Sequence, residues 1–166
     1  MKLDDVKALV VMLNGAGVRY LVVGGLAVVI YGHERLTMDM DMVVQLDRVN
    51  VLAAFTALAS LGYVPRVPVT GEQFADEATR ERWIAEKGMQ VLNLWSDRYP
   101  QTPVDLFVQE PFDFDAEYAA AREETLEPGA AFRVVRITTL IGMKRVAGRE
   151  KDLADVRSLE AIRDES

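Results

Sequence analysis

The sequence predicts an α+β fold, in which helices flank a mixed β-sheet and the chain ends in a helical tail. Short apolar runs typical of strands alternate irregularly with amphipathic segments of helical period. From residue 137 onward, helical periodicity alone is present. This order favours a mixed sheet over a doubly wound parallel one. We expect a core of residues 1–136 and a C-terminal helical segment, 137–166, that packs on it to give a single domain.

The first part of the chain has clear element boundaries. Its expected elements are a helix at 4–16, a strand at 19–23, a short helix at 25–32, a strand at 38–45 and a helix at 47–61. Asp47 is a candidate N-cap of the last of these helices, and Gly62 is its candidate stop.

The second part has weaker boundaries. Two prolines in 63–70 indicate an edge strand or a loop, and the polar segment 71–86 fits a helix or an ordered loop. The remaining expected elements are strands at 88–95 and 103–108, a surface helix at 115–124, a strand at 131–136 and helices at 138–147 and 150–163. We expect Thr138 or Thr139 to cap the first of the two final helices.

Composition excludes several classes of protein. The chain has 166 residues, no cysteine and one histidine, His33, which excludes disulfides, thiolate zinc sites and histidine-rich metal clusters. A net charge of −7 argues against broad nucleic-acid binding, although the basic segment 133–151 leaves room for a local grip on a triphosphate or an RNA end. No apolar stretch approaches the roughly 20 residues that cross a bilayer. We therefore expect a cytoplasmic protein without membrane contact.

Three aspartates interrupt apolar strands. Asp39 and Asp41 are two residues apart, so in a strand they share one face, while Met40 and Met42 point into the core. Asp105 lies in a second apolar run, PVDLFV, and completes a carboxylate triad if the two strands are neighbours. Such a triad suits Mg²⁺, which prefers oxygen ligands. The alternative is an exposed sheet face with solvated aspartates.

A glycine pair precedes these aspartates. Gly24 and Gly25 join a strand to a helix, where backbone N–H groups can approach a phosphate, although a tight turn is the commoner use of such a pair. Arg35 and Thr37 stand just before the aspartates and are candidates to bind the β- or γ-phosphate of a nucleotide. Their alternative roles are loop solvation and capping of the strand edge.

The C-terminal segment carries one lysine, Lys144, in an otherwise apolar helix. This placement indicates that Lys144 points toward the site formed by the aspartates. Asp152 and Asp155 are three residues apart and share a helix face, so they either hold Arg149 or position Lys144. A surface ion-pair network would explain the same residues.

These residues together resemble the DNA polymerase β-type nucleotidyltransferase superfamily. The similarity is to its small bacterial and archaeal members, which include abortive-infection toxins and minimal antibiotic nucleotidyltransferases. It covers residues 18–46, 103–108 and 137–160, and its motifs are the segment from Gly24 to Asp41, reading GGLAVVIYGHERLTMDMD, the run PVDLFV and the tail KRVAGREKDLADV. The resemblance implies a nucleotidyltransferase-like sheet with a site for two divalent metal ions.

The resemblance also implies a role for each residue. Asp39 and Asp41 would be metal ligands, and Asp105 would be a metal ligand or the base that takes the proton of the acceptor. Gly24 and Gly25 would contact the triphosphate of the nucleotide. Lys144 would neutralise phosphate charge.

The expected activity is Mg²⁺-dependent transfer of a nucleoside monophosphate from an NTP to an acceptor hydroxyl. The acceptor, which is an RNA end, a protein or a small molecule, is left open by the sequence. A toxin of this kind would need an antitoxin protein as partner. The alternatives are a non-catalytic nucleotide-binding or interaction module of the same fold, and a metal-dependent phosphohydrolase.

Overall fold

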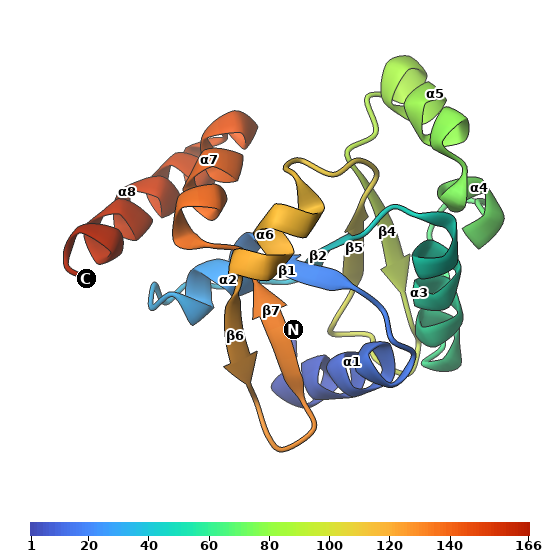
Figure 1. Ribbon diagram of the computed structural model, residues 1–166, viewed down its shortest axis with the longest axis horizontal. Coiled ribbons are helices and arrows are strands. Elements are labelled where there is room, and N and C mark those ends of the chain that lie inside the picture. The colour runs from blue at the N-terminus through green and yellow to red at the C-terminus, as the bar shows by residue number, and fades with distance from the viewer.

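A single mixed sheet of seven strands organises the chain, and its order is β3-β4-β5-β2-β1-β7-β6. The computed structural model describes all residues from Met1 to Ser166 (Figure 1). The strands are β1 (Tyr20–Val23), β2 (Met40–Val44), β3 (Val64–Pro65), β4 (Val91–Trp95), β5 (Val104–Phe107), β6 (Arg122–Thr125) and β7 (Ala131–Val134). The helices are α1 (Leu3–Gly15), α2 (Gly24–Ile30), α3 (Arg48–Ser60), α4 (Gly71–Ala75), α5 (Glu77–Lys87), α6 (Phe114–Ala120), α7 (Ile137–Ala147) and α8 (Glu150–Asp164).

Both kinds of strand pairing occur at the centre of the sheet. Strand β2 is antiparallel to β1 and parallel to β5, and β5 is antiparallel to β4. On the other side, β1 is parallel to β7, which forms an antiparallel hairpin with β6. The α+β prediction with a mixed sheet and a helical C-terminal segment is confirmed.

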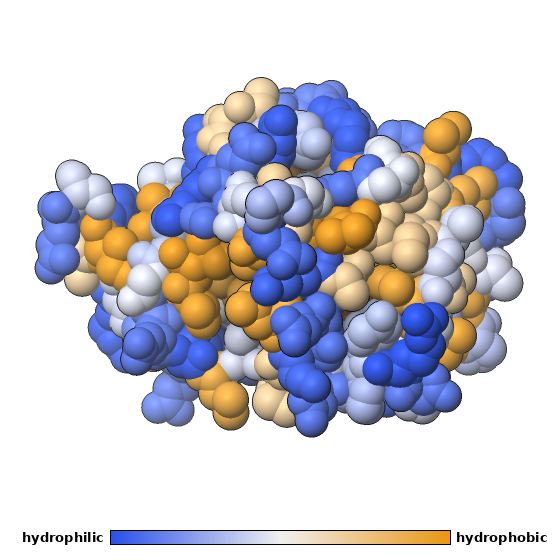
Figure 2. Space-filling view, turned by 90° about the horizontal axis from the view of Figure 1, so that it is seen from below, coloured by the Kyte–Doolittle hydropathy of each residue, from blue (hydrophilic) through white to orange (hydrophobic).

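The core lies on both faces of the central strands. Every residue of β1 is buried, and Met40, Met42 and Val44 of β2 are at most 1% exposed. Helix α1 packs on α3, and α7 packs on both α2 and α8, so the two final helices stand together at one end of the molecule (Figure 1). On the face seen from below, apolar patches are broken up by hydrophilic side chains (Figure 2). The longest helix, α8, is highly charged, and no helix combines the length and hydropathy that a bilayer crossing needs.

Most expected elements are present with shifts of one or two residues. Asp47 caps α3, since its side chain accepts a hydrogen bond from Asn50 N. The segment 63–70 contains the two-residue edge strand β3, and the undecided segment 71–86 forms two helices, α4 and α5, separated by Asp76. A reciprocal capping box starts α4 at Thr70, which explains why this polar segment is ordered.

Two expectations were wrong. The surface helix expected at 115–124 ends at Ala120, because residues 122–125 pair with β7 as strand β6, and this pairing overrides the helical preference of the sequence. The expected cap of α7 at Thr138 or Thr139 is also absent. Helix α7 begins at Ile137, so its N-cap residue is Arg136, whose side chain makes no capping hydrogen bond. Instead, Glu117 of α6 accepts Arg136 N at 2.8 Å and Thr139 Oγ1 at 2.9 Å.

Asn50 of α3 ties this helix to the sheet. Its Oδ1 accepts Arg19 N at 2.8 Å, and its Nδ2 donates to Arg19 O at 3.0 Å and to Gln45 O at 2.9 Å. The side chain is 8% exposed. It therefore satisfies three backbone groups at the adjacent ends of β1 and β2.

We predict that Asn50→Ala lowers the free energy of unfolding by about 2–3 kcal/mol, because Arg19 N and Gln45 O lose this side-chain partner and Arg19 O keeps only its bond from Gln45 N. Urea denaturation measures the change. The matched control is Thr56→Ala on the same helix, whose hydroxyl bonds only Leu52 O at an exposed position, and which should change stability by less than about 0.5 kcal/mol. Equal effects of the two substitutions would contradict this assignment.

Candidate functional site

Strand pairing brings the three aspartates together. Asp41 of β2 lies in register with Asp105 of β5 on one side and with Val23 of β1 on the other. The strand contact on which the triad depended is therefore present. Asp39 differs from expectation, because β2 begins at Met40, which donates its N–H to Pro103 O at 2.9 Å. Asp39 thus lies one residue before the strand, and its carboxyl still lies beside those of Asp105 and Asp41.

The glycine pair makes room for two side chains of this site. Gly24 has a φ of +67°, and a Cβ there would lie 1.9 Å from Asp41 Oδ2. At Gly25 a Cβ would lie 2.5 Å from Thr37 Oγ1 and 3.7 Å from Arg35 Cζ. The pair therefore has a packing role that sequence reasoning did not assign, since it lets Asp41 and Thr37 rest directly on the backbone.

Burial and repulsion between carboxylates raise the pKa values of Asp39 and Asp41. Burial raises the pKa of Asp41 to about 7, with further increases from Asp105 and Asp39, while Lys144 acts in the opposite direction. Burial and the neighbouring Asp105 also raise the pKa of Asp39 against the lowering effects of Arg66 and Lys151. A cation placed among the three carboxyl groups would favour their charged forms and reduce the repulsion between them. As they stand, no three acidic or imidazole side chains converge closely enough to hold a metal ion.

An ion-pair network on α7 and α8 borders the aspartates. Lys144 Nζ lies 3.0 Å from Asp155 Oδ2 and 3.3 Å from Asp152 Oδ1. Arg149 Nε lies 2.6 Å from Asp152 Oδ2. Burial raises the pKa of Asp152, but the hydrogen bonds from Arg149 and Lys144 outweigh it and the net pKa is lowered. Asp152 thus holds both Arg149 and Lys144, which the sequence had left as alternatives.

Arg35 joins this network from the loop before β2. Its Nη1 bonds Asp155 Oδ2, and His33 Nε2 lies 4.0 Å from Asp155 Oδ1. Arg35 and Lys144 therefore share one carboxylate that is 3% exposed. Lys144 is close enough to Asp41 to lower its pKa, and both cations already have an acidic partner. Their contact with phosphate stays a prediction.

Two further residues reach the site, and sequence reasoning missed both. Asn93 of β4 lies in register with Asp105 and donates from Nδ2 to Asp105 Oδ1 at 2.6 Å. Arg66 donates from Nε to Asn93 Oδ1. The available signal was a single amide in the apolar strand VLNLW. Asp97, the next acidic residue after β4, lies in an exposed turn and takes no part in this contact.

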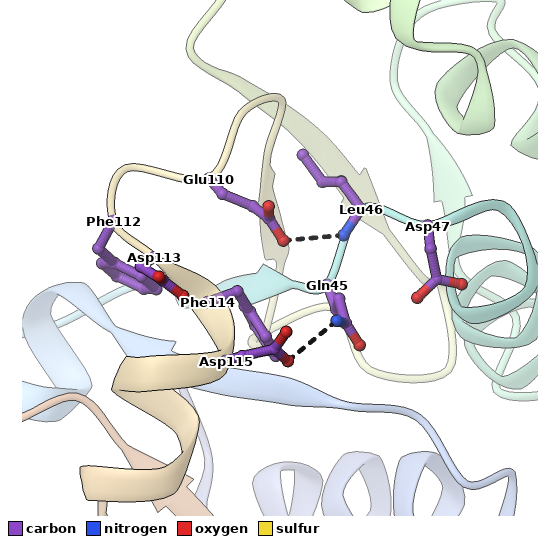
Figure 3. A pocket seen from close by; sticks show the side chains of 8 residues that line it. All are labelled: Gln45, Leu46, Asp47, Glu110, Phe112, Asp113, Phe114 and Asp115. Carbon is purple, nitrogen blue, oxygen red and sulfur yellow. Dashed lines mark hydrogen bonds between the residues drawn. The ribbon is translucent and has the colours of Figure 1, made fainter.

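A cavity of about 420 Å³ lies at the opposite end of β2 from the aspartates. Its acidic side chains have structural partners: Glu110 accepts Leu46 N at 3.1 Å, and Asp115 accepts Gln45 Nε2 at 3.3 Å (Figure 3). Asp47 and Asp113 cap α3 and α6. The cavity is therefore separate from the candidate site.

The fold is shared with solved nucleotidyltransferase structures. The chain is similar to the lincosamide antibiotic adenylyltransferase LnuA in its lincomycin-bound crystal structure, with a TM-score of 0.63, 14% identity and coverage of 98% of each chain. It is also similar to an antigenic nucleotidyltransferase-like protein from Paracoccidioides brasiliensis, with a TM-score of 0.53, 19% identity and coverage of 98% of this chain and 77% of the other. No family model matches the chain, and no curated protein matches it significantly. At these identities the likeness establishes a nucleotidyltransferase fold.

We predict that Gly24→Ala destabilises the protein by about 3 kcal/mol or more, because alanine is strained at positive φ and its Cβ overlaps Asp41. The matched control is Gly142→Ala in the middle of α7, where nothing lies within 4 Å of the added Cβ. That substitution should stabilise the protein by about 0.5–1 kcal/mol. Thermal unfolding measures both changes, and a neutral Gly24→Ala would show that Asp41 is not seated on this glycine.

We predict that Asp41→Asn stabilises the metal-free protein and that its advantage grows by about 2 kcal/mol between pH 5 and pH 8. The pKa of Asp41 is about 7 in the folded protein and 3.8 in the unfolded chain, so the folded state retains the proton longer and wild-type stability falls as pH rises through this window. Urea denaturation with EDTA at both pH values measures it. A pH-independent advantage would disprove the shift.

Proposed function

We propose that this protein is a Mg²⁺-dependent nucleotidyltransferase that moves a nucleoside monophosphate from an NTP to a hydroxyl group of an acceptor. One observation carries the proposal: Asp41 and Asp105 occupy paired positions of neighbouring strands, with Asp39 beside them, in a chain with a nucleotidyltransferase fold. Gathering three like charges at half-buried positions is costly. A bound cation would offset the repulsion between these carboxylates, which explains why they lie together.

The donor set fits Mg²⁺, because it consists of carboxylate oxygens whose repulsion a cation would relieve. Asp39, Asp41 and Asp105 would hold the ion. When bound, Mg²⁺ would supply charge neutralisation at the triphosphate and at the attacking hydroxyl. A two-metal arrangement is the version implied by the family resemblance.

The chain's own groups supply the rest of the reaction. The acceptor oxygen forms a bond to the α-phosphorus, the bond to the β-phosphate oxygen breaks, and pyrophosphate leaves. Asp105 would accept the proton of the acceptor hydroxyl. Arg35 and Lys144 would turn from Asp155 toward the negative charge on the phosphates, and Thr37 would donate a hydrogen bond to them. Gly24 and Gly25 would let the triphosphate approach the backbone.

A small-molecule hydroxyl is the acceptor that we favour. The net charge of −7 opposes a long nucleic-acid contact. LnuA, which covers the same length of chain, is an antibiotic adenylyltransferase with lincomycin bound. An RNA end or a protein hydroxyl remains the acceptor under the toxin hypothesis, which also requires an antitoxin partner and places the protein in the cytoplasm.

The test is transfer of label from each α-³²P-NTP with Mg²⁺ to a library of hydroxyl-bearing small molecules, whole-cell RNA and protein. We expect Asp41→Asn and Asp105→Asn each to reduce transfer at least about 100-fold. Asp97→Asn, in an exposed turn, is the matched control and should retain full activity. Full transfer by Asp41→Asn would disprove the assignment. Binding of Mg-NTP without pyrophosphate release would indicate the non-catalytic module, and phosphate release without an acceptor would indicate a phosphohydrolase.

A further inference from the structure

We propose that Asn93 and Arg66 are positioning residues that fix the orientation of the Asp105 carboxylate. Asn93 lies in register with Asp105 across the β4–β5 pair, and its Nδ2 donates to Asp105 Oδ1 at 2.6 Å. Arg66 in turn donates from Nε to Asn93 Oδ1. The three side chains therefore form a row across the sheet that ends at the aspartates.

The direction of this row follows from the chemistry of its first member. A guanidinium has donors only, so the atom of Asn93 that faces Arg66 must be the oxygen. The NH₂ group of Asn93 must then face Asp105, where it can only donate. Arg66 thus determines which end of the amide faces Asp105, although Arg66 makes no hydrogen bond or ion pair with that carboxylate.

Arg66 is held in place by two other contacts. Its backbone N–H donates to Asn93 O at 3.0 Å, and its guanidinium lies 5.7 Å from the centroid of the Trp95 ring. Trp95 is on the same strand as Asn93, two residues further along, so both side chains share one face of β4. An exposed arginine is thereby fixed over the strand that carries the amide.

Strand cohesion does not require this arrangement. Strands β4 and β5 are already joined along four register positions, and the opposite face of β4 packs Leu92 and Leu94 into the core at 1% exposure each. Apolar or β-branched cross-strand pairs are the usual choice for stability at such positions. The hydrogen bond from the Asn93 amide to Asp105 is therefore better explained by orientation of the carboxylate than by strand stability.

The consequence for the reaction is a choice between two oxygens. Asp105 Oδ1 accepts the amide N–H, so Oδ2 is the oxygen left for the cation or the incoming hydroxyl that the proposed function requires. This catalytic consequence rests on the proposed function, whereas the hydrogen bonds themselves do not. Loss of the row would let the carboxylate rotate and would slow the chemical step more than it weakens nucleotide binding.

Steady-state kinetics of transfer test the role. We expect Asn93→Leu and Arg66→Leu each to reduce kcat about 10- to 100-fold, with KM for the NTP changed less than about threefold. Because Arg66 acts through Asn93, the double variant should be no slower than Asn93→Leu. Arg66→Lys should recover much of kcat, since lysine is also a pure donor. Multiplicative losses in the double variant, or an effect on KM alone, would overturn the proposal.

Two matched controls separate positioning from general disruption. Arg98 also lies over an aromatic ring, 5.6 Å from the Tyr99 centroid, and bonds Ser60 O at 3.0 Å. Asn14 also bridges a donor, Tyr20 OH, and an acceptor, Ala131 O. Arg98→Leu and Asn14→Leu remove equivalent contacts away from Asp105 and should leave kcat unchanged within about twofold. A similar loss of kcat in the controls would overturn the proposal.

Side-chain amide NMR tests the row even if no acceptor is found. In the intact protein the Asn93 NH₂ should exchange slowly and resonate apart from exposed amides. Arg66→Leu and Asp105→Asn should each shift these signals and speed their exchange, while Arg98→Leu should not. Signals that do not respond to Arg66→Leu would overturn the proposal independently of any activity, whereas absent transfer with a responsive amide would count against the proposed function alone.

Discussion

The parallel pairing of β2 with β5 places Asp41 beside Asp105, and much of the site compensates for that juxtaposition. Two half-buried carboxylates repel each other, and partial burial together with this repulsion raises the pKa of Asp41 to about 7. Gly24 lets Asp41 lie against the backbone, while Asn93 gives Asp105 a donor. The neighbouring residues thus position the two charges without cancelling them, which leaves room for a cation.

The opposite charge is supplied from the C-terminal helices. Lys144 and Arg149 are fixed by the fully buried Asp152, and Asp155 links Lys144 to Arg35. Because these cations are paired with Asp152 and Asp155, they can remain near Asp39, Asp41 and Asp105 without forming ion pairs with them. The same pairs keep these side chains close to the position that a triphosphate would occupy under the proposed function, so little movement would be needed to engage it.

The sequence predicted the elements that follow from local pattern and missed those set by distant partners. Asp39, Asp41 and Asp105 could be singled out because charge on an apolar strand is unusual, and the Asp47 cap could be read from its position. Strand β6 could not, because REET favours a helix until β7 pairs with it. Asn93 and Arg66 were missed because the sequence does not show which residue lies opposite Asn93. Only the strand register places Asn93 beside Asp105. The bond between Arg35 and Asp155 joins residues 120 positions apart, beyond any helical or strand period.

That long-range bond has a consequence for synthesis of the chain. Residues of the sheet emerge from the ribosome before α8, so the nascent core holds Asp39, Asp41 and Asp105 while the helix that carries Asp152 and Asp155 is still absent. Arg35 and Lys144 lack their anchors over that interval. The charge pattern of the site is therefore completed only once α8 has been made. A chain released before residue 150 would carry the aspartates without the carboxylates that hold their counter-charges.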